Sequence, residues 1–176
     1  MDLRVKKTLK NIYNAFIQLR KKKEIEQISV KELAELAEIN KATFYLHFKD
    51  IYDLSDTMEN EMIESCMQSI PSDINLFSLE GIKYMSSIFS SQSELFYIVF
   101  SGSRAHFAAI KLDKYIRKHL YEIHPELENN LSANVKLTAL NYGGYYAFSI
   151  YGKDGSEDVL NSLSEIINID GQKYSF

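Results

Sequence analysis

Residues 29–48 read SVKELAELAEINKATFYLHF, and this stretch decides the fold of the first part of the chain. Its spacing predicts two short helices joined by a tight turn. Ser29 begins the first helix in a capping-box arrangement with Glu32, and apolar residues recur along it at intervals of three and four. Asn40 is a good N-cap for the second helix, which we expect from Lys41 to about His47. Helices this short are unstable alone, so they must pack against a neighbouring element.

The second of these helices has two different faces. Phe44 and Phe48 are four residues apart, and we expect both to point inward. The outward face carries Ala42, Thr43, Tyr45 and Leu46. A helix that enters the major groove of DNA, which is roughly 12 Å wide, needs small or hydroxyl-bearing side chains with a few long ones. The alternative, the core of an unrelated helical bundle, leaves this outward face unexplained.

The segment TFYLHFKDIYDL (residues 43–54), preceded by VKELAELAEINKA (residues 30–42), resembles the helix-turn-helix signature of the TetR family of transcriptional regulators. The close resemblance covers about the first quarter of the chain. It implies an all-α protein of about nine helices: a three-helix, N-terminal DNA-binding domain (residues 1–49) and a larger helical ligand-binding and dimerisation domain (residues 50–176). The chain departs from the family at Ile51, where members usually have a lysine that contacts phosphate. Whether this weakens DNA binding is open, and Lys49 is the candidate to replace that contact.

The resemblance also implies which residues contact DNA. Candidates for base-edge contacts are Lys31, Lys41, Ala42 and Thr43, and candidates for phosphate contacts are Ser29, Tyr45, His47 and Lys49. Lys41 is the best candidate for reading a base, because lysine can donate to guanine O6 and N7. These assignments predict a palindromic operator in double-stranded DNA.

Charge is distributed unevenly along the chain. Residues 1–50 hold 11 Lys and Arg against 7 Asp and Glu, whereas residues 51–176 hold 9 against 17. The net charge of −4 is therefore a sum of +4 and −8. The basic part coincides with the expected helix-turn-helix, which suits a protein that places one end on phosphates.

The composition is that of a protein of the cytoplasm. The chain is 45% apolar, which suffices for a core. A single cysteine, Cys66, excludes an internal disulfide. No stretch approaches about 18 consecutive apolar residues and no signal-peptide pattern is present, so we expect no membrane partner.

A first helix is expected from residue 3 to about residue 23. Its inward side would carry Val5, Leu9, Ile12, Phe16 and Leu19. Arg4, Lys6, Lys7 and Lys10 near its start are candidates for phosphate contacts or for a solvated face. The run from Arg20 to Lys23 suits the negative end of a helix dipole, and a DNA contact is the second interpretation.

The rest of the chain shows no strand alternation and predicts further helices. Asp50 would cap a helix that continues to about Ser69. Further helices are expected over residues 76–90, 93–100, 104–121 and 126–151, with a turn at Gly152–Gly155 and a last helix from Ser156.

The last two helices are expected to form a homodimer interface. Gly143 and Gly144 lie within a helix, where each costs about 1 kcal/mol relative to alanine, so close backbone approach would explain them. TetR-like proteins pair their two C-terminal helices with those of a second copy. The candidate interface residues are Gly143, Gly144, Ala147, Val159, Leu163 and Ile166, and intrachain packing of the glycines is the alternative.

The aromatic residues point to an effector pocket in the C-terminal part. Residues 77–176 hold 16 of the 22 Phe and Tyr residues, and pocket walls are mostly apolar with a few polar groups. The candidate residues are Tyr84, Phe89, Phe96, Tyr97, Phe100, Arg104, His106, Phe107 and Tyr142, although such a set is also typical of a core. The effector would be an unknown small molecule.

Other chemistry has little support in the sequence. There is no P-loop, no glycine-rich dinucleotide turn and no nucleophile elbow, so we expect no enzymatic activity. No cluster has metal-ligand spacing, so we expect no metal and no cofactor. The function predicted is a homodimeric regulator, a repressor released from its operator by a ligand. The alternative is a TetR-like co-activator whose C-terminal domain binds a protein partner.

Overall fold

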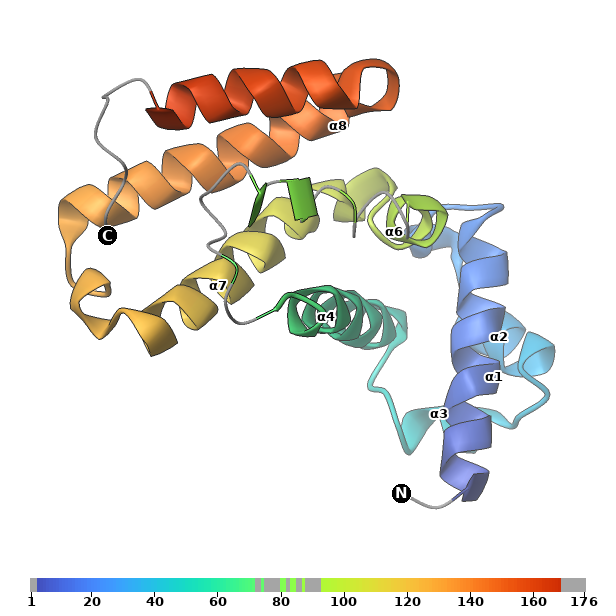
Figure 1. The fold of residues 1–176 in the computed structure, drawn as a ribbon. Coiled ribbons are helices and arrows are strands. Elements are labelled where there is room, and N and C mark those ends of the chain that lie inside the picture. The colour runs from blue at the N-terminus through green and yellow to red at the C-terminus, as the bar shows by residue number, and fades with distance from the viewer. Residues whose placement is uncertain are drawn as a thin grey trace. The chain divides into compact units, whose positions relative to one another are not determined.

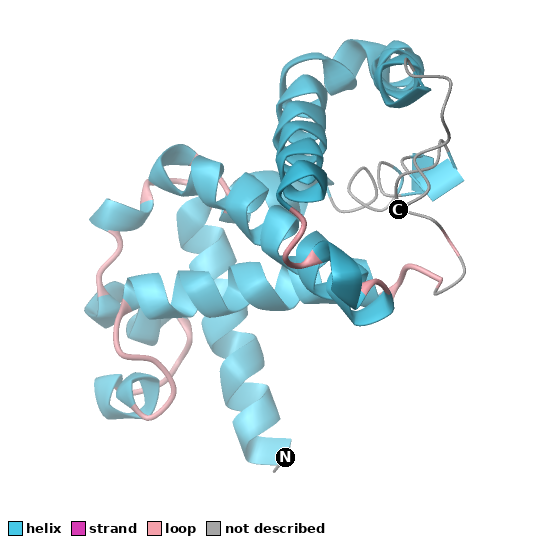
Figure 2. Ribbon diagram, turned by 90° about the vertical axis from the view of Figure 1, so that its left-hand side faces the viewer, coloured by secondary structure: helices cyan, strands magenta, loops and turns pink. Residues whose placement is uncertain are grey.

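The computed structural model describes residues 3–71, 74, 80, 81, 83, 84, 87 and 93–168. These residues form helices and connecting loops, and no strand occurs among them (Figures 1 and 2). The prediction of an all-α protein is confirmed over this part of the chain.

The helices follow the predicted order with shifted ends. They are α1 (Leu3–Arg20), α2 (Val30–Leu36), α3 (Lys41–Tyr45), α4 (Ile51–Gln68), α6 (Ser93–Val99), α7 (Ala105–Ile123) and α8 (Leu131–Asn168), with short 3-10 helices η1 (Ile25–Gln27), η2 (Gly102–Arg104) and η3 (Pro125–Leu127). α1 is three residues shorter than predicted, and the helix expected from residue 126 begins at Leu131, because residues 125–127 form η3. The helix predicted over residues 76–90 lies mostly outside the described residues.

The chain divides into two compact units. The first unit consists of Met1–Met62 and Gln92–Ala108, and the second unit consists of Ile63–Ser91 and Ala109–Phe176. α4 and α7 each begin in the first unit and end in the second. The first unit therefore contains α6 and η2, which lie well outside residues 1–49 in the sequence. The predicted division of function at residue 49 stays a prediction.

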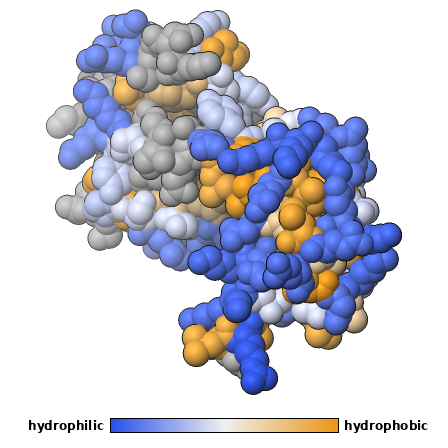
Figure 3. Space-filling model, turned by 90° about the vertical axis from the view of Figure 1, so that its right-hand side faces the viewer, coloured by the Kyte–Doolittle hydropathy of each residue, from blue (hydrophilic) through white to orange (hydrophobic). Residues whose placement is uncertain are grey.

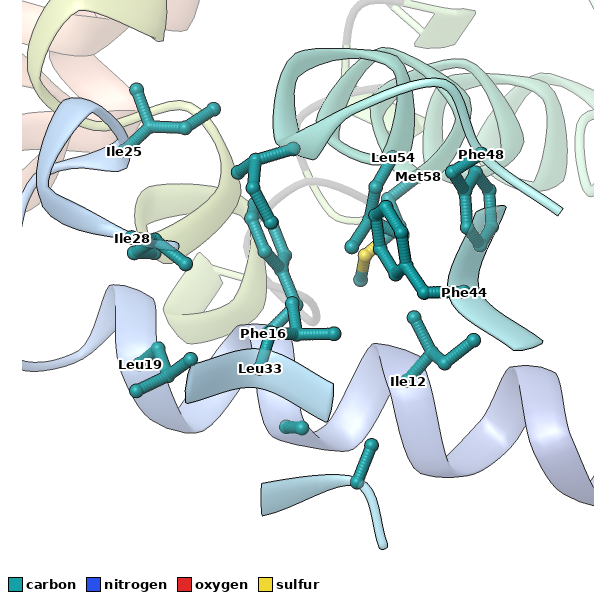
Figure 4. Packing of buried hydrophobic residues seen from close by; sticks show 13 residues of the cluster. Ile12, Phe16, Leu19, Ile25, Ile28, Leu33, Phe44, Phe48, Leu54 and Met58 are labelled. Atoms are coloured by element: carbon teal, nitrogen blue, oxygen red, sulfur yellow. The ribbon is translucent and has the colours of Figure 1, made fainter. Parts of the chain in front are cut away.

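One hydrophobic core holds the first unit together. It joins side chains from α1, η1, α2, α3 and α4: Ile12, Ala15, Phe16, Leu19, Ile25, Ile28, Leu33, Ala37, Phe44, Phe48, Ile51, Leu54 and Met58. Figure 4 shows Phe16, Phe44 and Leu54 pointing into the same space, with Ile12 approaching from α1. Full burial of each such side chain contributes about 1.5–3 kcal/mol, so this core supplies the stability that the short α2 and α3 lack.

The predicted inward face of α3 is confirmed, and the core also accounts for Ile51. Phe44 and Phe48 are both buried, with ring centroids 5.7 Å apart. Ile51, at the start of α4, is buried in the same cluster. An isoleucine at this position therefore adds to the core, where a lysine would have to reach out to solvent.

The start of α2 corrects the predicted capping box. Ser29 Oγ accepts a hydrogen bond from the Glu32 backbone N–H at 3.2 Å, as predicted. The Glu32 carboxylate accepts instead from Lys23 Nζ at 2.6 Å, so it ties α2 to the end of α1. A complete capping box occurs one element earlier, between Glu24 and Gln27 around η1. Lys23, nine residues before Glu32 in the sequence, competes for the Glu32 carboxylate, and the capping-box pattern does not include it.

In the second unit, α8 folds back on itself. Every residue from Leu131 to Asn168 is assigned as helical, so the turn predicted at Gly152–Gly155 does not appear as a separate non-helical loop, although the chain changes direction in this region. However, a Cβ atom built on Gly144 would lie 4.0 Å from Leu163 Cδ1, whereas 19 residues of straight helix span about 28 Å. The helix must reverse between these residues, as the orange and red parts of α8 show in Figure 1.

A polar network fastens α7 to the start of α8. The Arg117 guanidinium donates to Asp113 Oδ2 at 2.8 Å, to Asn134 Oδ1 at 2.6 Å and to Thr138 Oγ1 at 2.7 Å. The Tyr121 hydroxyl also bonds to Asn134. Beside this network, Leu120, Leu127, Ala133 and Leu137 form a small core. The α7–α8 connection is thus fixed by charge-assisted hydrogen bonds as well as by apolar contacts.

Candidate nucleic-acid interface

α3 presents a solvent-exposed face directly opposite its buried one. Lys41, Ala42, Tyr45 and Leu46 are exposed, whereas Phe44 is fully buried between them in sequence. Tyr45 is 57% exposed, and its ring meets the edge of Phe44 with centroids 5.5 Å apart. Because Phe44 is locked in the core, the backbone that carries the four exposed side chains is held in place.

The beginning of α3 is rigid as well. Asn40 Oδ1 accepts hydrogen bonds from the Thr43 backbone N–H at 2.8 Å and from Thr43 Oγ1 at 2.9 Å. The predicted N-cap is therefore confirmed. Thr43 is half-buried, and its hydroxyl hydrogen is directed to Asn40. A base contact by Thr43 would use its methyl group or an oxygen lone pair.

The backbone before α3 contains one residue in the left-handed region. Glu38 has φ = 57° in the turn after α2, a conformation that usually favours glycine or asparagine. The turn brings α3 against α2, and the Ile39 N–H donates to Ala34 O at 3.0 Å. The angle between the two helices is thus set by backbone geometry.

The other candidate DNA contacts, Lys31 for a base edge and Ser29, His47 and Lys49 for phosphates, differ in how exposed and how engaged their side chains are. Lys49 is exposed, and its backbone N–H donates to Asp53 Oδ2 at 2.9 Å. Lys31 is exposed on α2 with Nζ 4.0 Å from Glu35 Oε1, an arrangement typical of a weak surface pair. Ser29 is occupied as an acceptor by its helix cap, and His47 is half-buried beside Phe48.

The surface around these elements is predominantly polar. Figure 3 views the molecule from the side of α1 and α2 in Figure 1 and shows hydrophilic side chains with apolar patches between them. The basic side chains at the start of α1 are exposed: Arg4, Lys6, Lys7 and Lys10. Their exposure fits either phosphate contact or solvation, and both interpretations stay open.

Arg20 takes a role that the sequence did not indicate. α1 ends at this residue, but its side chain is fully buried and is therefore not a DNA contact. The guanidinium donates to Ser101 O at 3.0 Å and to Ser101 Oγ at 2.5 Å. Two neighbouring contacts join the same segments: Lys21 Nζ to Glu94 Oε1 at 2.8 Å, and Ser103 Oγ to Glu26 Oε1 at 2.5 Å.

These contacts lower the pKa values of the Glu26 and Glu94 carboxylates. The hydrogen bond from Ser103 holds the pKa of Glu26 below its usual range, and the hydrogen bond and charge of Lys21 do the same for Glu94. Gly102 lies between the two sites with φ = 57°, and a Cβ atom there would overlap the Glu24 carboxylate. Glycine is therefore required where η2 meets η1.

Arg104 links η2 to α4. Its guanidinium donates to Glu59 through Nε at 2.7 Å and through Nη2 at 2.8 Å, and Glu59 is fully buried. Ser55 Oγ donates to the same carboxylate at 2.8 Å, and the Arg104 guanidinium carbon lies 4.0 Å from the ring centre of Phe107. The hydrogen bonds to Glu59 raise the pKa of Arg104. Arg104 was predicted to line an effector pocket, but its charge is committed to this buried pair.

The other predicted pocket residues are divided between the two units. Phe96 and Tyr97 on α6, Phe100 directly after it, and His106 and Phe107 on α7 belong to the first unit, whereas Tyr84 and Tyr142 belong to the second. Phe89 lies outside the described residues. Tyr97 and His106 are exposed, and the Tyr84 hydroxyl donates to Ser69 O at 2.9 Å. The effector pocket thus stays a prediction.

The second unit contains an open cavity of about 450 Å³ with a different lining. It is bordered by Lys114, Arg117, Lys118, Tyr121, Glu122 and Glu128. None of these residues was predicted. Charged residues of both signs line it, and two of the lining residues, Arg117 and Tyr121, belong to the polar network between α7 and α8.

The predicted dimer residues fall into two groups. Val159 is buried and Leu163 is half-buried, and Gly144 packs toward Leu163 within the chain. Gly143 is exposed with open space where a side chain would lie, Ala147 is half-buried, and Ile166 is exposed. Intrachain packing therefore explains Gly144 but not Gly143.

An exposed apolar stripe runs along the first part of α8. Its members recur at intervals of three and four: Leu131, Val135, Ala139, Gly143, Tyr146 and Ile150. We call these six residues the α8 stripe. A contiguous exposed apolar face of this kind is typical of a protein-interaction surface. Gly143 of the glycine pair belongs to the stripe, whose exposure depends on which face of α8 packs on α7.

Among the described residues, no group of three or more His, Cys, Asp and Glu side chains could hold a metal ion. No helix in the same part of the chain has the length and apolarity needed to cross a membrane. No protein-family model, no curated protein and no solved structure matches the chain.

Proposed function

We propose that this protein is a sequence-specific DNA-binding transcriptional regulator of the TetR type, with α2 and α3 as its helix-turn-helix and α3 as its recognition helix. The observation that carries the proposal is the division of α3 into a buried Phe44 and an exposed face of Lys41, Ala42, Tyr45 and Leu46. A short, rigidly anchored helix that exposes such residues fits the major groove. The excess of four positive charges in residues 1–50 supports attraction to phosphates.

In this proposal the protein acts as a homodimer in the cytoplasm. One recognition helix buries little surface, whereas two copies about 34–36 Å apart read both halves of a palindrome. The α8 stripe is the candidate dimer surface. The protein would be a repressor without enzymatic activity or a cofactor, with about nine helices in total.

Release from DNA would follow from a small-molecule effector in the C-terminal part. Effector binding would shift α4, change the separation of the two recognition helices and lower the affinity for the operator. The contacts of Arg20 and Arg104 support this mechanism, because they tie Ser101 and η2, which follow α6, to α1 and α4. A displacement of α6 would therefore disturb the recognition unit.

The first experiment is selection of bound sequences from a random pool of double-stranded DNA at two salt concentrations. A palindromic motif with half-sites about one helical turn apart would support the proposal and identify the operator. Failure to enrich any motif with a dimeric protein would contradict it. That outcome would favour the co-activator alternative, in which an exposed apolar surface such as the α8 stripe binds a protein partner.

Two lysine variants separate base reading from phosphate contact. Lys41→Ala should lower discrimination at one base pair by about 1–3 kcal/mol, because lysine donates to guanine in the major groove. Lys49→Ala should weaken all sequences similarly and reduce the dependence of affinity on salt. Binding titrations with the selected operator and its single-base variants provide the measurement. Equal losses on all sequences for Lys41→Ala would contradict its assigned role.

A further inference from the structure

The exposed face of α3 consists of two chemically different edges. Lys41 and Tyr45 are four residues apart and form an edge with a charge and a hydroxyl group. Ala42 and Leu46 are also four residues apart and form a second edge that is wholly apolar. Leu46 has φ = −72° and ψ = −21°, so its backbone continues the helical geometry of α3. The two edges therefore lie side by side on one surface.

Leu46 has no role in the core that explains its side chain. It is 81% exposed, although Phe44 and Phe48 on either side of it are buried. The core cluster that anchors α3 does not include it. A large apolar side chain held in water at the centre of a proposed interface gains free energy when it meets another apolar group.

Charge and chemistry identify the partner group. Lys41 and Lys49 flank the apolar edge and are exposed, so they complement the phosphates of DNA and not an apolar protein surface. In the major groove, the C5-methyl group of thymine is the apolar group that distinguishes thymine from cytosine. We propose that Leu46, next to Ala42, contacts a thymine methyl group and so selects thymine at one position of each half-site. This inference rests on the proposed function.

The test uses the selected operator with deoxyuridine in place of thymine, one position at a time, in one half-site. This change removes only the methyl group. For the wild-type protein, the affinity should fall about fourfold at one position, the factor that corresponds to one buried methylene. Leu46→Ala should bind the thymine and uracil forms equally at that position and respond like the wild type elsewhere.

Two variants serve as controls. Leu36→Ala removes another exposed leucine of the first unit, at the end of α2, and should keep the wild-type response to uracil at every position. Leu46→Met retains an apolar side chain of similar size. It should still lose affinity when uracil replaces the thymine that Leu46 is proposed to contact. Circular dichroism of each variant establishes that α3 is intact.

The outcomes separate the inference from the function on which it rests. In one outcome, the wild type and Leu46→Ala both bind the operator and lose the same affinity when uracil replaces thymine at each position. That result would overturn the role of Leu46 and leave the proposed function standing. The absence of any selected operator would overturn both. Loss of sensitivity in Leu36→Ala as well would show that the effect is not specific to α3 and would also overturn the inference.

Discussion

At the scale of single residues, one buried side chain, Phe44, holds α3 in position. Phe44 is fully buried, and its ring lies in the cluster that also contains Ile12, Phe16 and Leu54. A helix of five residues has almost no stability of its own, so its position depends on this anchor. Adjacent residues thus have opposite environments, with Phe44 in the core and Tyr45 exposed to solvent.

This division predicts opposite effects for two adjacent substitutions. Phe44→Ala should lower the free energy of unfolding by about 3–5 kcal/mol, because it leaves a cavity in the core. Tyr45→Phe should leave the unfolding free energy nearly unchanged and weaken operator binding through loss of the hydroxyl group. Urea unfolding and DNA titration measure the two effects. An unchanged unfolding midpoint for Phe44→Ala would contradict the assignment of the inward face.

Tyr13 predicts a dependence of stability on pH. Its hydroxyl donates to Glu61 Oε1 at 3.1 Å, and burial followed by the Glu61 charge raises the pKa of Tyr13. Since the folded pKa exceeds the unfolded value of about 10, its contribution to stability is fully present below pH 10 and is lost as pH rises further. Urea unfolding at pH 8 and 10.5 should show a smaller loss for Tyr13→Phe than for the wild type. The exposed Tyr97→Phe is the control and should retain the wild-type loss.

At the scale of elements, the segment containing α6 and η2 belongs to the first unit. It contacts α1 through Arg20 and Lys21, η1 through Ser103, and α4 through Arg104. These partners lie 45–81 residues apart in the sequence. α4 is therefore held between the core around Phe44 and the guanidinium of Arg104, which makes this segment a suitable relay for an effector signal.

Removal of the Arg104 charge tests this arrangement. Arg104→Met should lower the free energy of unfolding by about 3–5 kcal/mol, because it leaves the buried Glu59 carboxylate without its guanidinium partner. A double variant, Arg104→Met with Glu59→Met, should recover most of this loss. Lys21→Met removes an exposed pair in the same segment and should change stability little. Urea unfolding measures these free energies. If Arg104→Met were as stable as the wild type, the structural role of the Arg104–Glu59 pair would be refuted.

At the scale of the whole molecule, two long helices connect two compact units. The chain passes between the units at three points, and two of these lie within α4 and α7, which each run from the first unit into the second. The second unit carries the α8 stripe, which leaves apolar side chains in water over about five turns of helix. A second copy of the chain that covered this stripe would remove these side chains from water.

The stripe predicts which residue controls dimerisation. Ile150→Asp should weaken self-association by about tenfold or more, because a charge would be buried in an apolar interface. Ile110→Asp changes an exposed isoleucine on α7, outside the stripe, and should leave association unchanged. Sedimentation velocity over a range of concentrations measures both. Loss of the dimer should also lower operator affinity, and a dimer of unchanged stability in Ile150→Asp would exclude the α8 stripe as its interface.

The sequence by itself determined the local structure: the all-α character, the caps at Ser29 and Asn40, and the burial of Phe44 and Phe48. These features depend on side-chain spacing and on hydrogen bonds within a few residues. Only the tertiary structure decided the roles of Arg20 and Arg104, the partner of Glu32 and the exposure of the α8 stripe. Each of these depends on which distant segments pack together, and a single sequence does not encode that pairing in any local pattern.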